Sequence, residues 1–279
     1  MKPESASYAA EQLRLTDRDR YFATLVLGSK EREALTALYA FNADIASVRE
    51  RAREPAAGEI RLQWWADALT GEGHGAVRQN PLADALLSSI ADYGLPVPPL
   101  TRMIAARRFD LYQDPMPDIA TFEGYAGETV SALYQLGAMI LNGGKPVETG
   151  DAAGHLGVAH ALIGHLRAFG YNASQGRIFV PWNVLATNGV NEGEVLTGQM
   201  SEGLAAALAQ LSDMAGDHLE KAESAIATLP RPLKPVFAPI AVLKAQHRRL
   251  DLETPFVRRD DLPDWWKIAL LGWWKLRNA

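Results

Sequence analysis

The sequence predicts an all-α protein folded as one domain, and three observations support this class. Apolar residues recur at helical spacing along most of the chain, and Gly and Pro gather in short clusters between these segments. Runs typical of β-strands are nearly absent. The one β-like run, RIFVPW, contains Pro181, a residue that a central strand does not accommodate.

Several helical segments have recognisable ends. In NPLADALLSSIADYG we expect Asn80 to cap the first turn, Pro81 to occupy the first helical position and Gly94 to end the helix. A long helix is expected to start from a Ser29 cap. The helices predicted from periodicity cover residues 29–54, 80–94, 98–113, 118–144, 150–170, 201–228 and 235–250.

Composition excludes several classes of protein. Of the 279 residues, 48% are hydrophobic and 22% charged, a mixture typical of a folded globular chain rather than a disordered one. The net charge of −5 argues against a nucleic-acid-binding protein, which needs a basic face. The absence of cysteine excludes disulfides, thiolate metal sites and cysteine nucleophiles.

The sequence also gives an expectation about location. The first fifteen residues lack the apolar segment of a secretory signal, and the longest apolar stretch, SALYQLGAMIL, is too short to span a bilayer. We therefore predict a cytoplasmic protein without a transmembrane segment. Peripheral contact with the inner membrane stays open.

Four stretches occur in a recognisable order: ALTALYAFNADIASVRE, EIRLQWWADAL, AARRFDLY and GVAHALIGHLRAFGYNASQGRIFVP. Together they resemble the squalene/phytoene synthase family, over roughly residues 17–190. The resemblance implies an isoprenoid-synthase-type helical bundle around a central cavity. It predicts that residues 1–279 form this single domain.

Enzymes of that family join two prenyl diphosphates head to head, and carboxylates four residues apart on two facing helices hold Mg²⁺ for the departing diphosphate. In this sequence the resemblance places those four positions at Ala46, Glu50, Ala168 and Asn172. Only Glu50 is a carboxylate. We therefore assign no catalytic residue, no metal ligand set and no cofactor, and predict a catalytically degenerate protein.

Nearby acidic residues do not restore the set. Asp44 lies two helical positions before Ala46, a rotation of about 200° to the other side of the helix. Asp213 and Asp217 have the right spacing, but their surroundings are typical of a solvated face. His155, His160 and His165 repeat every five residues, which does not bring them together as metal ligands.

If the fold holds, six residues are expected to line a remnant pocket. Asp110 has a second interpretation, because it is also placed to pair with Arg107 or Arg108 on its own helix. For Tyr39 a core position is favoured over the pocket, and for Arg177 a contact that ties the GRIFVP turn to a neighbour is favoured. The predicted pocket residues are Tyr39, Asn42, Arg49, Asp110, Tyr171 and Arg177.

The segments AFNADIASVRE, RLQWW and LRAFGYNASQGRIFVP also resemble, within that family, the mitochondrial complex I assembly factor 6 branch, which lacks the Asp pairs. This narrower resemblance implies a role in assembling respiratory complex I, with its subunits or assembly intermediates as partners. Two alternatives stay open. One is an active head-to-head prenyl transferase that uses Mg²⁺, and the other is a non-catalytic protein that binds an isoprenoid or another lipid.

A Trp-rich helix is expected at about residues 263–278. Four tryptophans, Trp265, Trp266, Trp273 and Trp274, repeat at seven or eight residues, close to two helical turns. Lys267, Lys275 and Arg277 accompany them, so the helix is a candidate surface for anionic lipid or an acidic partner. Packing of this helix against the bundle is the alternative, and one part of it can pack while another stays exposed.

Overall fold

The computed structural model describes residues 1–52, 54–73 and 75–278, and every regular element in this part of the chain is helical. The all-α prediction is therefore confirmed for the described residues. The α-helices are α1 (Pro3–Thr16), α2 (Arg18–Thr24), α3 (Ser29–Ala46), α4 (Val48–Arg51), α5 (Pro55–Thr70), α6 (Pro81–Tyr93), α7 (Val97–Arg107), α8 (Ile119–Ala126), α9 (Ala132–Leu141), α10 (Gly150–Arg167), α11 (Phe169–Ser174), α12 (Trp182–Thr187), α13 (Glu192–Leu196), α14 (Glu202–Thr228), α15 (Pro239–His247) and α16 (Asp264–Asn278).

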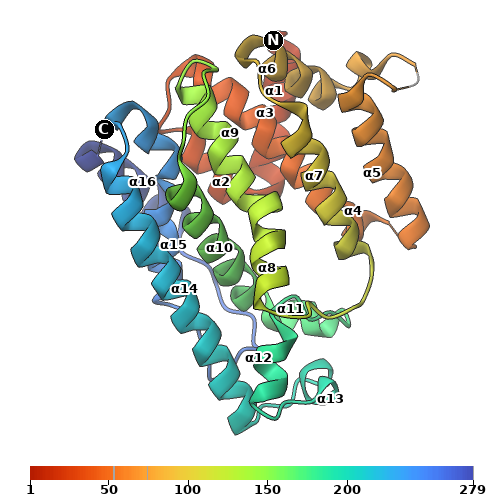
Figure 1. Cartoon of the computed structure of the whole chain (residues 1–279), viewed down its shortest axis with the longest axis vertical. Helices are drawn as coiled ribbons and strands as arrows, with labels where there is room; N and C mark the ends of the chain where they lie inside the picture. The colour runs from red at the N-terminus through yellow and green to blue at the C-terminus, as the bar shows by residue number, and fades with distance from the viewer. Residues whose placement is uncertain (53, 74, 279) are drawn as a thin grey trace.

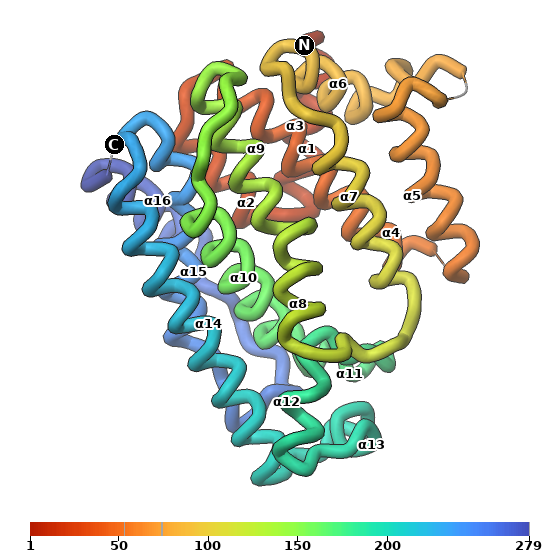
Figure 2. Tube along the Cα trace, viewed as in Figure 1, coloured from red at the N-terminus to blue at the C-terminus, as the bar shows by residue number. Residues whose placement is uncertain are grey.

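The helices form one bundle (Figure 1). The long helices α10 and α14 pack side by side, and α3 packs on α1, α6 and α9. The two termini lie apart (Figure 2), but α16, near the C-terminus, contacts α2 from the N-terminal part of the chain as well as α15. Helix α16, which follows the family-like motifs in the sequence, therefore packs into the same bundle as they do.

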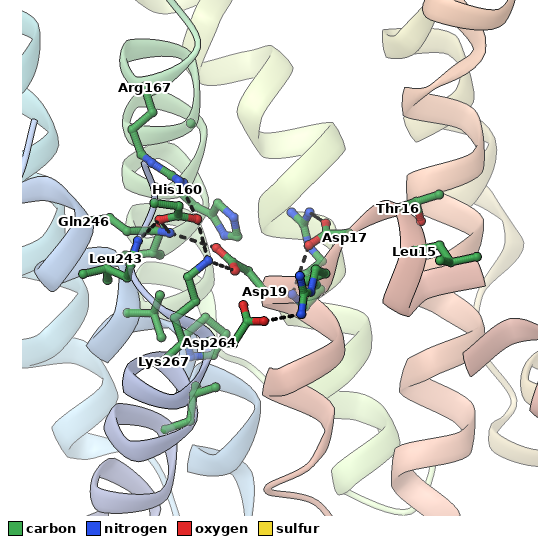
Figure 3. Close-up of a pocket in the computed structure, with 18 residues that line it drawn as sticks. Leu15, Thr16, Asp17, Asp19, His160, Arg167, Leu243, Gln246, Asp264 and Lys267 are labelled. Atoms are coloured by element: carbon green, nitrogen blue, oxygen red, sulfur yellow. Dashed lines mark hydrogen bonds and ion pairs between the residues drawn. The ribbon is translucent and has the colours of Figure 1, made fainter. Parts of the chain in front are cut away.

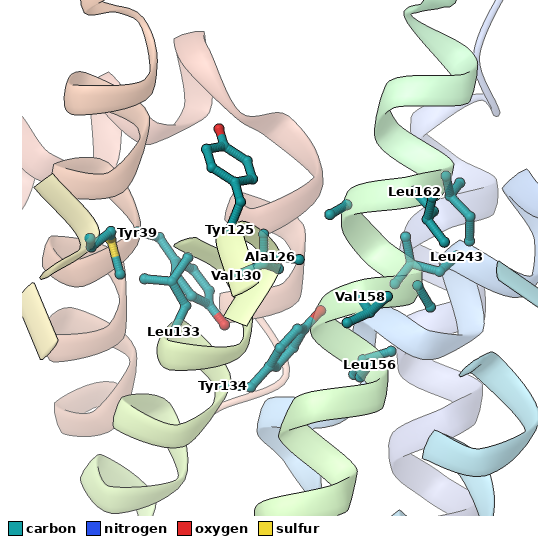
Figure 4. Packing of buried hydrophobic residues seen from close by; sticks show 14 of the residues in the cluster. Tyr39, Tyr125, Ala126, Val130, Leu133, Tyr134, Leu156, Val158, Leu162 and Leu243 are labelled. Atoms are coloured by element: carbon teal, nitrogen blue, oxygen red, sulfur yellow. The ribbon is translucent and has the colours of Figure 1, made fainter. Parts of the chain in front are cut away.

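The core between these helices is apolar and aromatic (Figure 4). Leu133 and Leu162 lie among the buried side chains, with Tyr39, Tyr125 and Tyr134. The ring of Tyr134 stacks on Phe237, with centroids 5.7 Å apart. Because buried tyrosines need partners for their hydroxyl groups, this core also contains polar side chains, which are described below.

The predicted ends of the helix around residues 80–94 are confirmed. Oδ1 of Asn80 accepts hydrogen bonds from the backbone N–H groups of Leu82, at 3.0 Å, and Ala83, at 3.2 Å. Pro81 is the first residue of α6. Gly94 follows the helix with a φ of 57°, a left-handed conformation that favours glycine.

The long helix expected over residues 29–54 is interrupted. Ser29 is the first helical residue rather than the cap, which is Gly28, and the helix ends at Ala46. The hydroxyl of Ser47 donates to the carbonyl oxygen of Asp44, at 2.9 Å, and such a local bond competes with the regular helical pattern. The chain resumes as α4, while Arg53 lies outside the described residues.

The helix predicted over residues 150–170, which carries the second motif, is also interrupted. Helix α10 ends before Ala168, and α11 begins after it. The backbone N–H of Asn172 still donates to the carbonyl oxygen of Ala168, at 2.8 Å. The two residues therefore stay one helical turn apart, as the sequence predicts, although they do not belong to one continuous α-helix.

Other predicted helices are shorter or divided. The segment over residues 118–144 forms α8, a π-helical turn at Gly127–Ser131, and α9. Residues 98–113 end as a 3-10 turn at Arg108–Leu111. The helix predicted at 235 begins only at Pro239, after a 3-10 turn, because proline lacks the N–H that a helix interior requires.

Candidate functional site

The segments around the two predicted motifs meet through Arg49. Its Nη2 lies 3.4 Å from Oδ1 of Asn172, so a side chain of α4 contacts a side chain of α11. The same guanidinium lies over the ring of Phe179, 4.6 Å from its centroid, and 3.8 Å from Oε1 of Glu50. The structure thus places a cation between Glu50 and Asn172, two of the four positions that the resemblance assigns to metal-binding carboxylates.

These residues do not fit a cluster of divalent cations. Ala46 and Ala168 have no donor atom, and the amide oxygen of Asn172 faces a guanidinium. Glu50 is the one carboxylate of the set, and it is close to half exposed. Hard cations such as Mg²⁺ need several oxygen ligands, and the nearby Arg49 charge opposes their binding. Among the described residues, no three His, Cys, Asp or Glu side chains gather as ligands.

The other acidic residues considered from the sequence lie elsewhere. Asp44 pairs with Arg51, at 2.8 Å, and accepts a hydrogen bond from Nε1 of Trp65, also at 2.8 Å. Asp44 therefore contacts α4 and α5, on a different side from the contact between Arg49 and Asn172. Asp213 and Asp217 are exposed on α14, as the sequence predicts.

Asp110 belongs to a buried polar cluster. Its carboxylate accepts from Nη1 of Arg107, at 3.1 Å, and from the hydroxyl of Tyr125, at 2.8 Å. Nη1 of Arg107 also donates to that hydroxyl, at 2.6 Å, and Nη2 lies 3.4 Å from Oδ1 of Asn42. Of the two interpretations, the ion pair with Arg107 is the one the structure shows, and Asn42 is joined to it.

A second buried cluster surrounds Tyr39, which is a core residue. Arg20 lies 5.9 Å from the centroid of its ring and donates to the carboxylate of Asp17, at 2.5 Å. Burial raises the pKa of the Tyr39 hydroxyl well above its usual value. Although burial alone raises the pKa of Asp17, the nearby Arg20 charge brings it below its usual value.

Two buried histidines, His160 and His165, have pKa values lowered by burial and by nearby arginine charges. Burial, reinforced by Arg49 and Arg107, lowers the pKa of His165 to about 3. Burial and the Arg20 charge lower the pKa of His160 likewise to about 3, and its Nδ1 lies 2.9 Å from the hydroxyl of Tyr134. These two imidazoles remain uncharged at neutral pH.

The histidines do not converge. Nδ1 of His155 lies 3.0 Å from Nδ1 of His218, on α14, whereas His165 stacks on Phe179, with centroids 5.3 Å apart. His160 contacts Tyr134 instead. The three side chains therefore contact different partners, as their five-residue spacing predicts.

A surface pocket of about 330 Å³ opens beside Arg49. Arg177 also lines it, and among the described residues its buried Nε has no hydrogen-bond partner. The backbone N–H of Arg177 donates to the carbonyl oxygen of Asn172, at 3.0 Å, which fixes the turn after α11. Two of the six predicted pocket residues, Arg49 and Arg177, therefore line a pocket together.

Tyr171 differs from its prediction. Its side chain is 54% exposed and does not line the pocket with Arg49 and Arg177. The reason is geometric, since Tyr171 precedes Asn172 by one residue and points about 100° away from it around the helix. Asn172 itself is buried.

A larger pocket, of about 510 Å³, lies between α2, α10, α15 and α16 (Figure 3). One of its walls is a charged network around Lys267, whose Nζ lies 2.5 Å from both Asp19 and Asp261. Arg167 of α10 pairs with Asp261 at 2.7 Å, and Gln246 of α15 donates to Asp19 at 2.8 Å.

Sequence reasoning missed this network. Lys267 is only 4% exposed, so its expected role at a lipid or partner surface is wrong. The charged run DRDR, residues 17–20, is visible in the sequence, but its spacing does not indicate a partner across the core. The partners of Asp19, Lys267 and Gln246, are 248 and 227 positions away, and only the fold brings them together.

The Trp-rich helix α16 packs on the bundle with one side and exposes the other. Leu271 and Lys267 are buried and Trp274 packs against the core, whereas Trp265 is 67% and Trp273 64% exposed. Trp266 is also exposed, with its ring edge-to-face on Trp265. Within the described residues, no helix is long and apolar enough to cross a bilayer.

The all-α fold and the ordered sequence motifs lead to the family of this chain. The sequence pattern described as squalene/phytoene synthase matches residues 13–265, and the chain belongs to this family. A dehydrosqualene synthase structure has the same fold, with a TM-score of 0.81 and 18% identity, over 98% of this chain and 96% of that one.

Two kinds of relatives are similar to this chain. Complex I assembly factor 6 of Rattus norvegicus is 28% identical over 84% of this chain and 70% of its own length, and that of Homo sapiens is 28% identical over 82% and 69%. The 15-cis-phytoene synthase of Synechococcus elongatus is 25% identical, over 90% of this chain and 86% of its own. The family thus includes both assembly factors and prenyl-transferring enzymes.

Proposed function

We propose that this protein assists the assembly of NADH:quinone oxidoreductase and does not turn over prenyl diphosphates. The observation that carries the proposal is Arg49, which lies between the two motifs and contacts Asn172. A guanidinium there supplies positive charge without the ligand geometry or the Lewis acidity of paired metal ions. The similarity to complex I assembly factor 6 supports a role in the assembly of this complex in place of catalysis.

The remaining carboxylate gives a sharp test. If the protein acts through its surface and scaffold, Glu50 is dispensable, because its side chain is nearly half exposed and has only a 3.8 Å contact with Arg49. If the protein is a Mg²⁺-dependent enzyme, Glu50 is the one anionic ligand left in the set, and its loss is severe.

The experiment deletes the gene in its own host and measures membrane NADH:quinone oxidoreductase activity and the amount of intact complex. We expect both to fall, and both to be restored equally by the wild-type gene and by Glu50→Gln. Normal complex in the deletion strain would contradict the proposal. So would release of pyrophosphate from farnesyl or geranylgeranyl diphosphate by the purified protein, if it required both Mg²⁺ and Glu50.

A further inference from the structure

The C-terminal helix α16 presents an unusually apolar outer face. Five exposed side chains lie on it: Trp265 (67% exposed), Trp266 (42%), Ile268 (45%), Trp273 (64%) and Leu276 (80%). At 100° per residue, Trp265, Trp266, Trp273 and Leu276 fall within an arc of about 100° opposite Lys267 and Leu271, and Ile268 flanks this arc on the Leu271 side. We call these five residues the outer face of α16.

The orientation of this face is fixed by the inner side of the same helix. Lys267 is held by Asp19 and Asp261, and Leu271 is buried in the core. Rotating α16 to hide the tryptophans would expose Leu271 and remove Lys267 from two carboxylates. The outer face is therefore a permanent feature of the folded protein and not the result of a loosely attached helix.

We propose that the outer face of α16 docks this protein on an anionic lipid bilayer. Exposed apolar surface on a folded protein marks a contact site, and tryptophan is the side chain best suited to the boundary between water and hydrocarbon. Its ring enters the apolar region while its indole N–H stays hydrated. An amphipathic helix with this composition lies in the plane of the membrane surface.

Charge favours lipid as the occupant and favours anionic lipid in particular. The protein carries a net charge of −5, yet the last turn of α16 contains Lys275 and Arg277. Arg231 belongs to the 3-10 turn at Arg231–Phe237, which contacts α16 and also contains Lys234. Basic residues in the last turn of this helix and in the 3-10 turn that contacts it, on an otherwise acidic protein, favour a negatively charged bilayer.

The inference is independent of the assembly function, and purified full-length protein tests it. The protein is sedimented with vesicles of phosphatidylcholine, alone or mixed with phosphatidylglycerol. We expect binding to the mixed vesicles, weaker binding to the neutral ones, and loss of binding on the order of tenfold or more for Trp265→Ser with Trp273→Ser.

Two matched controls separate the outer face from general effects. Ile60→Ser with Leu196→Ser removes exposed apolar side chains from other helices and should leave binding unchanged. Lys275→Gln with Arg277→Gln should weaken binding to the anionic vesicles by about fivefold per charge, whereas Lys145→Gln with Lys221→Gln should not. Thermal unfolding of each variant establishes that it is folded.

Three results would overturn the proposal. The first is wild-type protein that stays in the supernatant with both vesicle types. The second is a Trp265 and Trp273 double variant that is folded and binds as the wild type does. The third is a wild-type dimer that does not bind vesicles and dissociates in the double variant, which would assign the outer face to a second copy of the chain.

Discussion

Arg49 and Asn172 are 123 positions apart in the chain, and Nη2 of one lies 3.4 Å from Oδ1 of the other. This contact joins α4 to α11, next to Glu50 and Asn172, two of the positions that the family resemblance assigns to metal-binding carboxylates. The guanidinium of Arg49 also lies over the ring of Phe179. We therefore expect this contact to form without a divalent cation.

The first prediction concerns the stability contributed by Arg49. Arg49→Ala should lower the free energy of unfolding by about 1–2 kcal/mol, because it removes the contact with Asn172 and the cation–π contact with Phe179. Arg51→Ala is the matched control, since Arg51 is 40% exposed in its pair with Asp44, and should cost about 0.5 kcal/mol. Urea denaturation measures both, and equal losses would contradict this role for Arg49.

The second prediction concerns metal binding. The wild-type protein should show no heat of Mg²⁺ binding in titration calorimetry, and chelation should leave its thermal unfolding unchanged. The combined variant Ala46→Asp, Ala168→Asp, Asn172→Asp and Arg49→Leu restores four carboxylates with Glu50 and should bind Mg²⁺. Saturable Mg²⁺ binding by the wild type that is lost in Glu50→Gln would refute the electrostatic argument.

The third prediction concerns Lys267. Lys267→Met should destabilise the protein by about 2–3 kcal/mol, because it leaves Asp19 and Asp261 without their shared cation in a largely buried network. Lys244→Met is the control, as its pair with Glu223 is more exposed, and should change stability by about 0.5 kcal/mol or less. Denaturant unfolding compares them, and similar values for the two variants would count against the network.

The fourth prediction concerns close helix packing. A Cβ atom at Gly157 would lie 2.0 Å from Oγ and 2.6 Å from the backbone nitrogen of Ser131, so Gly157→Ala should destabilise by about 2 kcal/mol or more. Gly164, on the same helix, has no atom within 4 Å of that position. Gly164→Ala should instead stabilise by about 0.5–1 kcal/mol, through the better helix propensity of alanine. Thermal unfolding tests the difference in sign.

The fifth prediction concerns acid sensitivity. The pKa of His160 and of His165 is about 3 in the folded protein, against 6.5 for an ordinary histidine. Between these values the unfolded chain binds protons that the folded protein does not, so stability falls as the pH drops below about 6.5. Each histidine contributes up to about 1.4 kcal/mol per pH unit. Stability measured from pH 7 to 5 should fall less steeply in His165→Phe, and an unchanged slope would contradict this assignment.

The sequence was sufficient for the class of fold and for the family. Helical periodicity, the Asn80 and Gly94 ends and the ordered motifs all depend on local spacing, which the chain itself specifies. The residue types at Ala46, Ala168 and Asn172, to which the resemblance assigns metal-binding carboxylates, are likewise given by the sequence itself. None of these conclusions required knowing which distant residues touch.

Only the tertiary structure shows which side chain contacts Asn172 and which side of α16 is exposed. Arg49 reaches Asn172 because α4 and α11 meet, and Lys267 is buried because α16 lies beside α2. The four tryptophans of α16 repeat evenly in sequence, yet Trp274 packs inward while Trp273 is exposed. Periodicity gives the relative directions of side chains around a helix, but the rotation of that helix against the core is set by long-range partners, which local sequence does not encode.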